Sequence, residues 1–299
     1  MQNVLRKLKR ITAFDVVLYL LFALIAVVTI FPLWNILMIS LAPNSYYVEH
    51  GIVLFPGELT LRNYEYIFTT STVLDAVWNS VSVSVLYVIY SMFLMIPLAY
   101  GLSRPDLPGK KWLITYVLLP MYFGGGVIPF YLVVKELGLI DSMAALVIPY
   151  GVNIYYLIII KNSFTAVPGS LIEAAQIDGA NDFVIMFRIV IPMAKATIAT
   201  FALFLLVDKW NDWYSSMLFL SDGNMYPLAK LLRDIIYNNM NVGDMSVIIK
   251  PGSSGEDLYA GAEGIKMATV VVALIPILCV YPFLQKYFVR GVATGAIKS

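Results

Sequence analysis

The chain has 299 residues, of which 60% are hydrophobic and only 13% are charged, whereas a soluble domain carries about 25% charged residues. These proportions exclude an ordinary soluble protein and predict an all-α integral membrane protein. With one histidine, one cysteine and a net charge of +1, the composition also argues against a histidine-rich metal site, a disulfide within the chain and nucleic-acid binding.

The N-terminal region has a basic cluster, Arg6 to Arg10, followed by a long apolar run over residues 14–41. A cleaved signal sequence has an apolar core of roughly 7–15 residues and a small-residue cleavage site. This run is much longer and has no such site. We therefore expect a retained membrane helix, preceded by a cytoplasmic N-terminus at residues 1–13.

Six apolar runs have about the 20 residues that a membrane-spanning helix needs. They predict six transmembrane helices over residues 14–41, 76–102, 112–134, 142–160, 194–220 and 265–288. Several contain proline or glycine, which bundled helices tolerate because neighbours satisfy the freed backbone groups. Gly124-Gly125-Gly126, in the third run, predicts a bend or a close helix contact.

The orientation follows from the basic residues, which concentrate on the cytoplasmic side of a membrane protein. An even number of spans with the N-terminus inside places about twice as many of the 20 lysines and arginines inside as outside. Both termini are then cytoplasmic. This arrangement predicts a six-span permease domain over 14–290, a cytoplasmic tail at 291–299, a cytoplasmic loop at about 161–193, and outer loops at 42–75 and 221–264.

The cytoplasmic loop is longer than a simple connection requires and is ready to form helices. Pro168-Gly169 breaks the chain, after which Ser170 and Glu173 form a capping-box pattern. Gly179 suits the position after a helix end. Asn181 or Asp182 then caps a second helix that leads to Pro192. The pattern predicts a helix, a tight turn and a second helix.

Small residues in this loop would let another surface approach closely, as a partner's groove requires. We expect the docking residues to be Glu173, Ala174, Ala175, Asp178, Gly179 and Ala180. The alternative is an interfacial helix that lies on the lipid headgroups.

The loop resembles a known signature. Its motifs Glu173-Ala174-Ala175, Asp178-Gly179-Ala180 and Ile189-x-Ile191-Pro192 are similar to the signature loop of bacterial ABC importer permeases, with Ile191 where leucine is usual. Further motifs resemble the carbohydrate branch related to the second membrane subunit of the maltose importer, and within it the subgroup for complex oligosaccharides and polysaccharide fragments. They are Asn79-Ser80, Gly125-Gly126-Val127-Ile128-Pro129, Leu137-Gly138-Leu139, Trp210-Asn211-Asp212-Trp213, Tyr226-Pro227-Leu228 and Leu231-Leu232-Arg233.

The resemblance covers nearly the whole chain and implies a type I ABC importer permease fold in the bacterial cytoplasmic membrane. It implies a second homologous permease, two ABC ATPase subunits, an extracytoplasmic solute-binding protein and a carbohydrate substrate. The loop would be the coupling helix that docks on an ATPase. The chain has no G-x-x-x-x-G-K-[ST] phosphate loop, so we expect ATP and Mg²⁺ on the partner ATPase and neither a cofactor nor a catalytic residue here.

A polar cluster interrupts the fifth predicted span. Charge at that depth is costly and usually faces a cavity or a partner helix. Asp208 and Asp212 would share a helix face, and Lys209 can pair with Asp212. Tryptophans there could stack on sugar rings or form an interfacial belt. The candidate substrate-path residues are Asp208, Lys209, Trp210, Asn211, Asp212, Trp213, Asn79, Tyr122 and Asn153, although helix-to-helix hydrogen bonds would explain the last three equally well.

Lys209 raises the hypothesis of an acidic sugar, but its two neighbouring aspartates argue against a simple anion trap. Two other functions remain alternatives. An ion-coupled secondary transporter would use Asp208 and Asp212 as cation sites and would work without ATPase subunits. An ABC importer of the same architecture for a non-sugar solute would differ in what its binding protein delivers.

Overall fold

The computed structural model describes residues 12–43, 46, 50–69, 71–237, 263–279 and 282. The secondary structure of these residues is helical and contains no strand, in agreement with the predicted all-α class. Contacts divide the chain into two compact units. The first is Met1–Thr69 with Asn241–Val271, and the second is Thr70–Met240 with Val272–Ser299.

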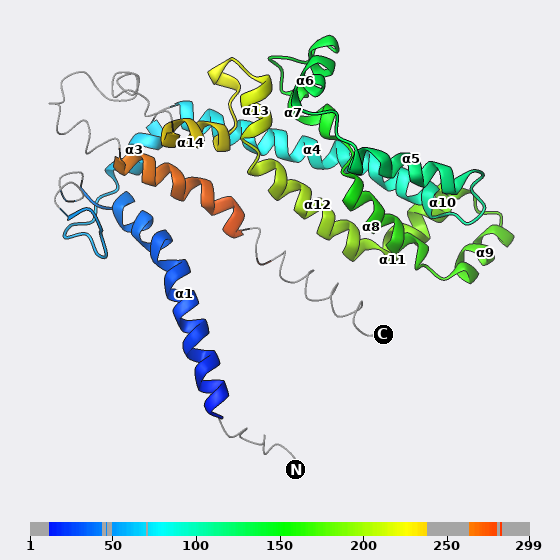
Figure 1. Cartoon of the computed structure of the whole chain (residues 1–299), viewed down its shortest axis with the longest axis horizontal. Helices are drawn as coiled ribbons and strands as arrows, with labels where there is room; N and C mark the ends of the chain where they lie inside the picture. The colour runs from blue at the N-terminus through cyan, green and yellow to red at the C-terminus, as the bar shows by residue number, and fades with distance from the viewer. Residues whose placement is uncertain are drawn as a thin grey trace. The chain divides into compact units, whose positions relative to one another are not determined.

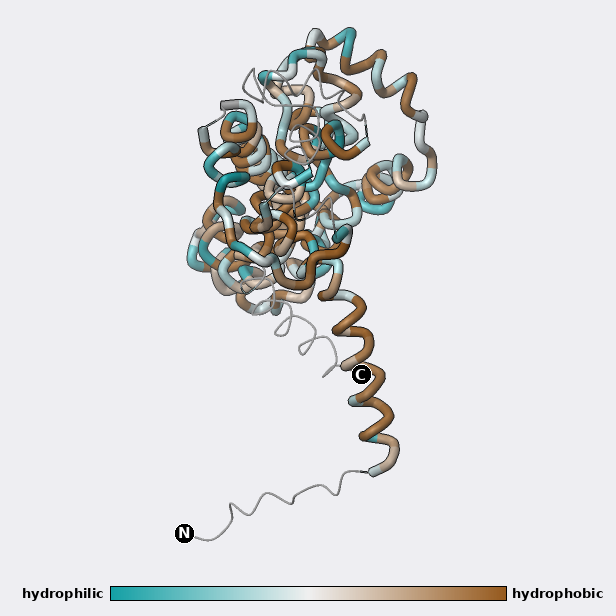
Figure 2. Tube along the Cα trace, turned by 90° about the vertical axis from the view of Figure 1, so that its left-hand side faces the viewer, coloured by the Kyte–Doolittle hydropathy of each residue, from teal (hydrophilic) through white to brown (hydrophobic). Residues whose placement is uncertain are grey.

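The first unit begins with α1, Ala13–Ser40, which agrees with the predicted span 14–41. Its 28 residues extend about 42 Å, enough to cross a hydrocarbon layer of about 30 Å. Thr12 and Asp15 form a capping box at its start. The helix is hydrophobic along nearly all its length (Figure 2), and its side chains are exposed over most of that length. An apolar environment must therefore cover it.

The end of α1 is anchored to the segment that follows. Val53 packs against the last turn of α1. The side-chain amide of Asn35 on α1 donates to the backbone carbonyl of Val53 at 3.0 Å. A short helix, α3 (Arg62–Thr69), places Asn63 and Tyr64 against Ser40. Burial raises the pKa of Tyr64, so its hydroxyl is a neutral partner for Ser40. The predicted outer loop 42–75 therefore contains an anchored helix.

The second unit is built around α4, Ser71–Ser103, which begins earlier than the predicted span 76–102. It packs against α8 (Ile154–Thr165) and α12 (Lys195–Trp210), which run beside it in Figure 1. The core between them is apolar. Its fully buried members include Met95, Leu157, Ile160, Ile185 and Leu205.

The third predicted span, 112–134, is divided into two helices. Helix α5 (Lys110–Tyr122) and helix α6 (Val127–Glu136) meet at an angle of 113°. The break falls on the three glycines 124–126, and Gly126 has a φ of 85°, which other residues rarely adopt. The predicted bend at these glycines is confirmed. Helices of this length extend only about 15–20 Å, too short to cross a membrane singly.

Two more predicted spans contain breaks. In 142–160, α7 (Ala144–Val147) and a 3₁₀ turn, η1 (Ile148–Tyr150), meet α8 at 51°. In 194–220, α12 ends at Trp210 and α13 (Tyr214–Phe219) follows. A 3₁₀ turn, η3 (Gly223–Met225), and α14 (Leu228–Tyr237) then occupy the start of the predicted loop 221–264. The remaining elements are α9 (Gly169–Ile177), α10 (Asp182–Ile185), the π turn η2 (Met186–Val190) and α11 (Ile191–Met193).

Within the described residues, α1 and α4 are each long and apolar enough to cross a membrane. Counting each bent pair as one span raises the number to five at most. The sixth predicted span, 265–288, is helical over 263–279, and most of its remainder lies outside the described residues. Membrane spans are thus supported, while the count of six stays a prediction.

Gly151, between η1 and α8, tests the packing of the second unit. A Cβ at this position would lie 2.4 Å from Cε1 of Tyr90 on α4. We expect Gly151→Ala to destabilise the protein by roughly 1–3 kcal/mol because the Tyr90 ring must shift. Thermal unfolding in detergent would measure the loss. The control is Gly101→Ala inside α4, where no atom lies within 4 Å and stability should hold or rise. Equal losses in both variants would contradict this packing.

Candidate functional site

The segment after α8 has the predicted helix–turn–helix form. Helix α9 ends in a turn in which the N–H of Ala180 donates to the carbonyl of Ala175 at 2.9 Å. The N–H of Gly179 donates to Gln176 at 3.0 Å, and the φ of Gly179 is 81°. These two bonds form a Schellman motif, which requires a left-handed residue at this position. The predicted role of Gly179 in ending the helix is confirmed.

The predicted capping box at the start of α9 is wrong. The helix begins at Gly169, and the preceding Pro168 occupies the cap position without a side-chain hydrogen bond. The helix therefore begins before Ser170, whose hydroxyl lies in the first turn. The second helix does have the predicted cap, because Oδ1 of Asn181 accepts from the N–H of Val184 at 2.9 Å.

The second helix is tied to α4 through Asp182. The hydroxyl of Tyr100 donates to this carboxylate at 2.8 Å, and the guanidinium of Arg104 lies 3.7 Å from it. Nζ of Lys110 in turn donates to the carbonyls of Ser103 and Arg104 at 3.1 and 2.7 Å. The end of α4, the start of α5 and the start of α10 are therefore held together. A force on α10 would reach α4 through these contacts.

Several apolar side chains of this segment are exposed. Ile177 is 87% exposed, Phe183 and Leu171 are also exposed, and α9 has no buried residue. Ala174 is exposed beside them, whereas Ala175 is partly buried against the core. We call Leu171, Ala174, Ile177 and Phe183 the docking surface. Exposed apolar side chains that form a large patch typically mark an interaction site, and these four are candidates for one.

In the polar cluster of the fifth predicted span, Lys209 is turned into the bundle and is only 6% exposed. Its Nζ donates to Oδ2 of Asp212 at 2.7 Å and to Oγ of Ser215 at 3.2 Å. The same ammonium lies 4.6 Å from the ring centroid of Tyr150 and 5.3 Å from that of Tyr87. The predicted Lys209–Asp212 pair is confirmed, and the chain itself surrounds the cation.

Asp208 lies on α12 and Asp212 lies beyond its end, so the two do not belong to one helix as predicted. Helix α12 ends at Trp210, so helical spacing does not continue to Asp212. Asp208 is exposed and accepts a hydrogen bond from the hydroxyl of Tyr156 at 2.7 Å. Asp212 accepts from the N–H of Ser215 at 3.0 Å, which supports the start of α13.

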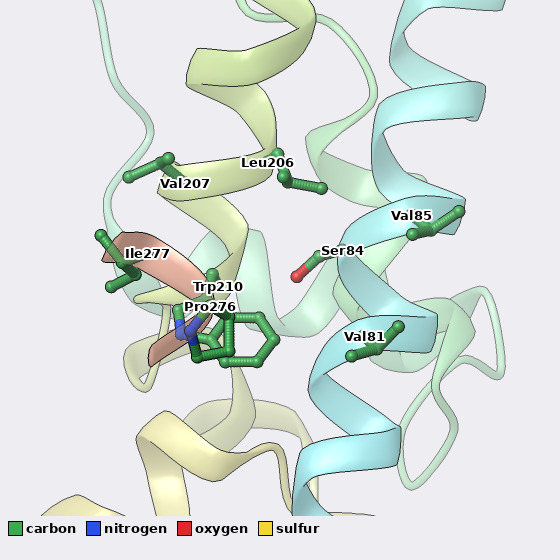
Figure 3. A pocket seen from close by; sticks show the side chains of 8 residues that line it. All are labelled: Val81, Ser84, Val85, Leu206, Val207, Trp210, Pro276 and Ile277. Atoms are coloured by element: carbon green, nitrogen blue, oxygen red, sulfur yellow. The ribbon is translucent and has the colours of Figure 1, made fainter. Parts of the chain in front are cut away.

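Trp210 is buried, and its indole N–H donates to the carbonyl of Ala273 at 3.3 Å. It borders a cavity of about 190 Å³ (Figure 3) lined by Val81, Ser84, Val85, Leu206, Val207, Trp210, Pro276 and Ile277. The hydroxyl of Ser84 points into this cavity and has no hydrogen-bond partner among the described residues. The lining is otherwise apolar, whereas a hydroxyl-rich ligand such as a sugar needs several convergent polar groups.

Three predicted asparagines form hydrogen bonds within the chain. The amide of Asn79 donates to the carbonyls of Asn224 and Tyr226 at 2.8 and 3.3 Å and so fixes the loop before α14. Asn153 caps α8, and Asn211 donates back to the carbonyl of Val207. Tyr122 is exposed at the end of α5. These bonds give the three asparagines structural roles, while a contact with substrate stays a prediction.

Several contacts between aromatic rings and charged groups were not predicted from the sequence. Tyr87 and Tyr150 reach Lys209 from distant parts of the chain, and no local spacing signals them. Arg233 on α14 lies 4.3 Å from the ring centroid of Trp213 and 5.8 Å from that of Tyr237. The second of these contacts has the i,i+4 spacing of helix neighbours, which was a usable signal.

The Lys209–Asp212 pair gives a stability prediction. Lys209→Met should destabilise the protein by about 3 kcal/mol, because a largely buried carboxylate loses its counter-ion. Lys209→Met combined with Asp212→Asn should recover much of that loss. Thermal unfolding in detergent compares the two variants. A single variant as stable as the wild type would show that the pair contributes nothing.

Comparison with known proteins identifies the family. The model of the family described as "Binding-protein-dependent transport system inner membrane component" matches residues 8–294. The chain is 41% identical over 286 residues to the polygalacturonan/rhamnogalacturonan transport system permease protein YtcP of Bacillus subtilis, covering 95% of this chain and 98% of that protein. It is 27% identical to the arabinooligosaccharides transport system permease protein AraQ of Halalkalibacterium halodurans, covering 93% and 94% of the two chains.

A solved structure agrees. The crystal structure of a bacterial ABC transporter involved in the import of the acidic polysaccharide alginate contains a chain that is 27% identical to this one. The alignment covers 96% of this chain and 100% of that chain, with a TM-score of 0.83. The chain therefore belongs to the family of binding-protein-dependent transport system inner membrane components.

Proposed function

We propose that this chain is one of two homologous permease subunits of an ATP-driven ABC importer that moves oligosaccharides across the bacterial cytoplasmic membrane. The observation that carries the proposal is the helix–turn–helix at 169–193, whose first helix has no buried residue, in a chain that the family model matches almost throughout. The similarity to permeases named for oligosaccharide and polysaccharide transport supports a carbohydrate substrate. It favours an importer over an ion-coupled secondary transporter.

In this proposal α9 and the start of α10 form the coupling helix. The docking surface enters a groove of one ATPase, and Gly179 fixes the angle between the two helices. Movement of the ATPase would pull α10, and the contacts of Asp182 with Tyr100 and Arg104 would pass the movement to α4. Because α4 packs against α8 and α12, these helices would move with it.

The remaining partners are inferred from the missing phosphate-binding loop and from the exposed apolar helices. No phosphate-binding loop occurs in the sequence, so two separate ATPase subunits would bind ATP and Mg²⁺. The exposed apolar sides of α1 and α5 would be covered by the second permease and by lipid. An extracytoplasmic binding protein would deliver the sugar, with both termini of the permease in the cytoplasm. The chain acts mechanically and holds no catalytic group.

The path for the sugar follows the exposed members of the polar cluster. Asp208, Asn211 and Trp213 are exposed around the end of α12 and could reach a solute between the two permeases. Lys209, Trp210 and Asp212 make contacts within the chain and would support that surface. The proposed path therefore keeps the exposed residues as solute contacts and treats the three residues bonded within the chain as their support.

A bulky residue on the docking surface should uncouple the transporter. We expect Ala174→Trp to reduce both the recovery of ATPase subunits with the permease and the uptake of sugar at least tenfold, because the indole would prevent close approach. The matched control is Ala166→Trp at the exposed end of α8, which should leave both quantities within about twofold of wild type. Normal recovery and uptake in Ala174→Trp would refute the docking assignment.

Reconstitution tests the function itself. Proteoliposomes that contain this chain, its partner permease and both ATPases should take up an oligosaccharide delivered by the binding protein, and only with internal ATP. Removing the ATPases should abolish uptake, whereas a protonophore should not. Uptake by the permease alone that a protonophore abolishes would establish a secondary transporter. Uptake restricted to non-sugar solutes would refute the carbohydrate substrate.

A further inference from the structure

Arg233 lies between two aromatic rings at the surface of the second unit. It projects from α14, 4.3 Å from the ring centroid of Trp213 and 5.8 Å from that of Tyr237. Trp213 is itself held edge-on by Tyr214, with ring centroids 5.7 Å apart. The side chain of Arg233 is 28% exposed, Trp213 is 37% exposed and Tyr237 is largely exposed. The group is therefore ordered by contacts and still accessible.

The local charges leave a positive excess at Arg233. Its acidic partner among the described residues is Asp234, at 3.7 Å. That carboxylate is buried and accepts a hydrogen bond from Lys230, whose ammonium is also buried. Among the described residues, one negative charge thus stands against two positive charges. The excess lies at the more exposed of the two cations, Arg233, rather than at the enclosed Lys230.

The stacking leaves the donors of the guanidinium available. A cation–π contact uses the flat face of the group, while its N–H donors point outward in the plane. That planar fork matches both oxygens of a carboxylate, and an arginine already held by aromatic rings loses less freedom when it binds. The exposed aromatic rings offer apolar faces to the C–H groups of a sugar ring. The group therefore combines the two contacts that an acidic sugar unit can make.

Lys209 does not offer such a site, although it is the cation that first suggested an acidic substrate. Its ammonium is enclosed by Asp212, Ser215 and two tyrosine rings, and it is only 6% exposed. Binding a second carboxylate there would require breaking the pair with Asp212. Binding a carboxylate at Arg233 would not require breaking a comparable hydrogen-bonded pair, because the neighbouring Asp234 is already bonded to Lys230.

We propose that Arg233, with Trp213 and Tyr237, binds a carboxylate-bearing unit of the transported oligosaccharide, so that the substrate class is acidic, uronate-containing sugar. This inference rests on the proposed function and deepens it. Arg233 supplies the carboxylate contact, and the two aromatic residues supply stacking. A neutral oligosaccharide would keep the stacking and lose the charged contact.

Direct binding to the permease tests the proposal. The complete transporter is placed in nanodiscs without the binding protein, so that only the permease pair selects the sugar. Calorimetry then measures the affinity for trigalacturonate and for its fully methyl-esterified, neutral form. The wild type should bind the acid form at least tenfold more tightly, as expected for a charge-assisted hydrogen-bond pair. Arg233→Gln should remove the preference, so that the acid form and the ester bind to this variant with similar affinity.

Two further variants keep the test decisive. Arg233→Lys should retain part of the preference, because charge remains but the fork is lost. The matched control, Arg62→Gln, removes an exposed arginine of the first unit and should keep the full preference. A tenfold preference that survives in Arg233→Gln, or equal or undetectable binding of both forms by the wild type, overturns the proposal. If the reconstituted transporter nonetheless imports sugars with its binding protein, the proposed function survives; import of no sugar at all refutes both.

Discussion

Backbone groups in the hydrocarbon of a membrane have no water to bond, and this constraint shapes the entire chain. It explains why the predicted spans form helices and why side chains support the breaks before α8 and between α12 and α13. Asn153 accepts from the first turn of α8, and Asp212 accepts from the first turn of α13. Asn211 bonds back to Val207 at the end of α12. The polar residues that look like candidate ligands thus also hold the broken helices together.

The buried ammonium of Lys209 also depends on contacts within the chain. An ammonium at the depth of Lys209 is costly unless charges and ring faces surround it. Tyr87, Tyr150 and the segment that holds Asp212 and Ser215 provide those contacts from three places along the chain. The pair therefore belongs to the scaffold. Under the proposed function, solute contacts are left to the exposed groups around it, and Arg233 is a partly exposed cation among the described residues.

What the sequence could predict was local. Gly179 ends a helix because its left-handed conformation depends on its immediate neighbours. Lys209 and Asp212 pair because they are three residues apart. The start of α9 was misplaced because Pro168 occupies the cap position ahead of Ser170. The sequence pattern alone does not show which of the two residues caps the helix. Three glycines predicted a bend, but the angle of 113° and the tyrosines around Lys209 depend on distant packing that spacing does not encode.

The central claim is that force enters this chain through the docking surface, and crosslinking tests it most directly. The natural Cys279 is first replaced by serine, and a cysteine is placed at Ile177, the most exposed apolar side chain of that surface. In the assembled transporter, a short thiol crosslinker should join this position to a cysteine in the ATPase groove, with a yield that changes between the ATP-bound and nucleotide-free states. Position 177 labelled only from outside the cell, or never crosslinked to an ATPase in any nucleotide state, would contradict the account.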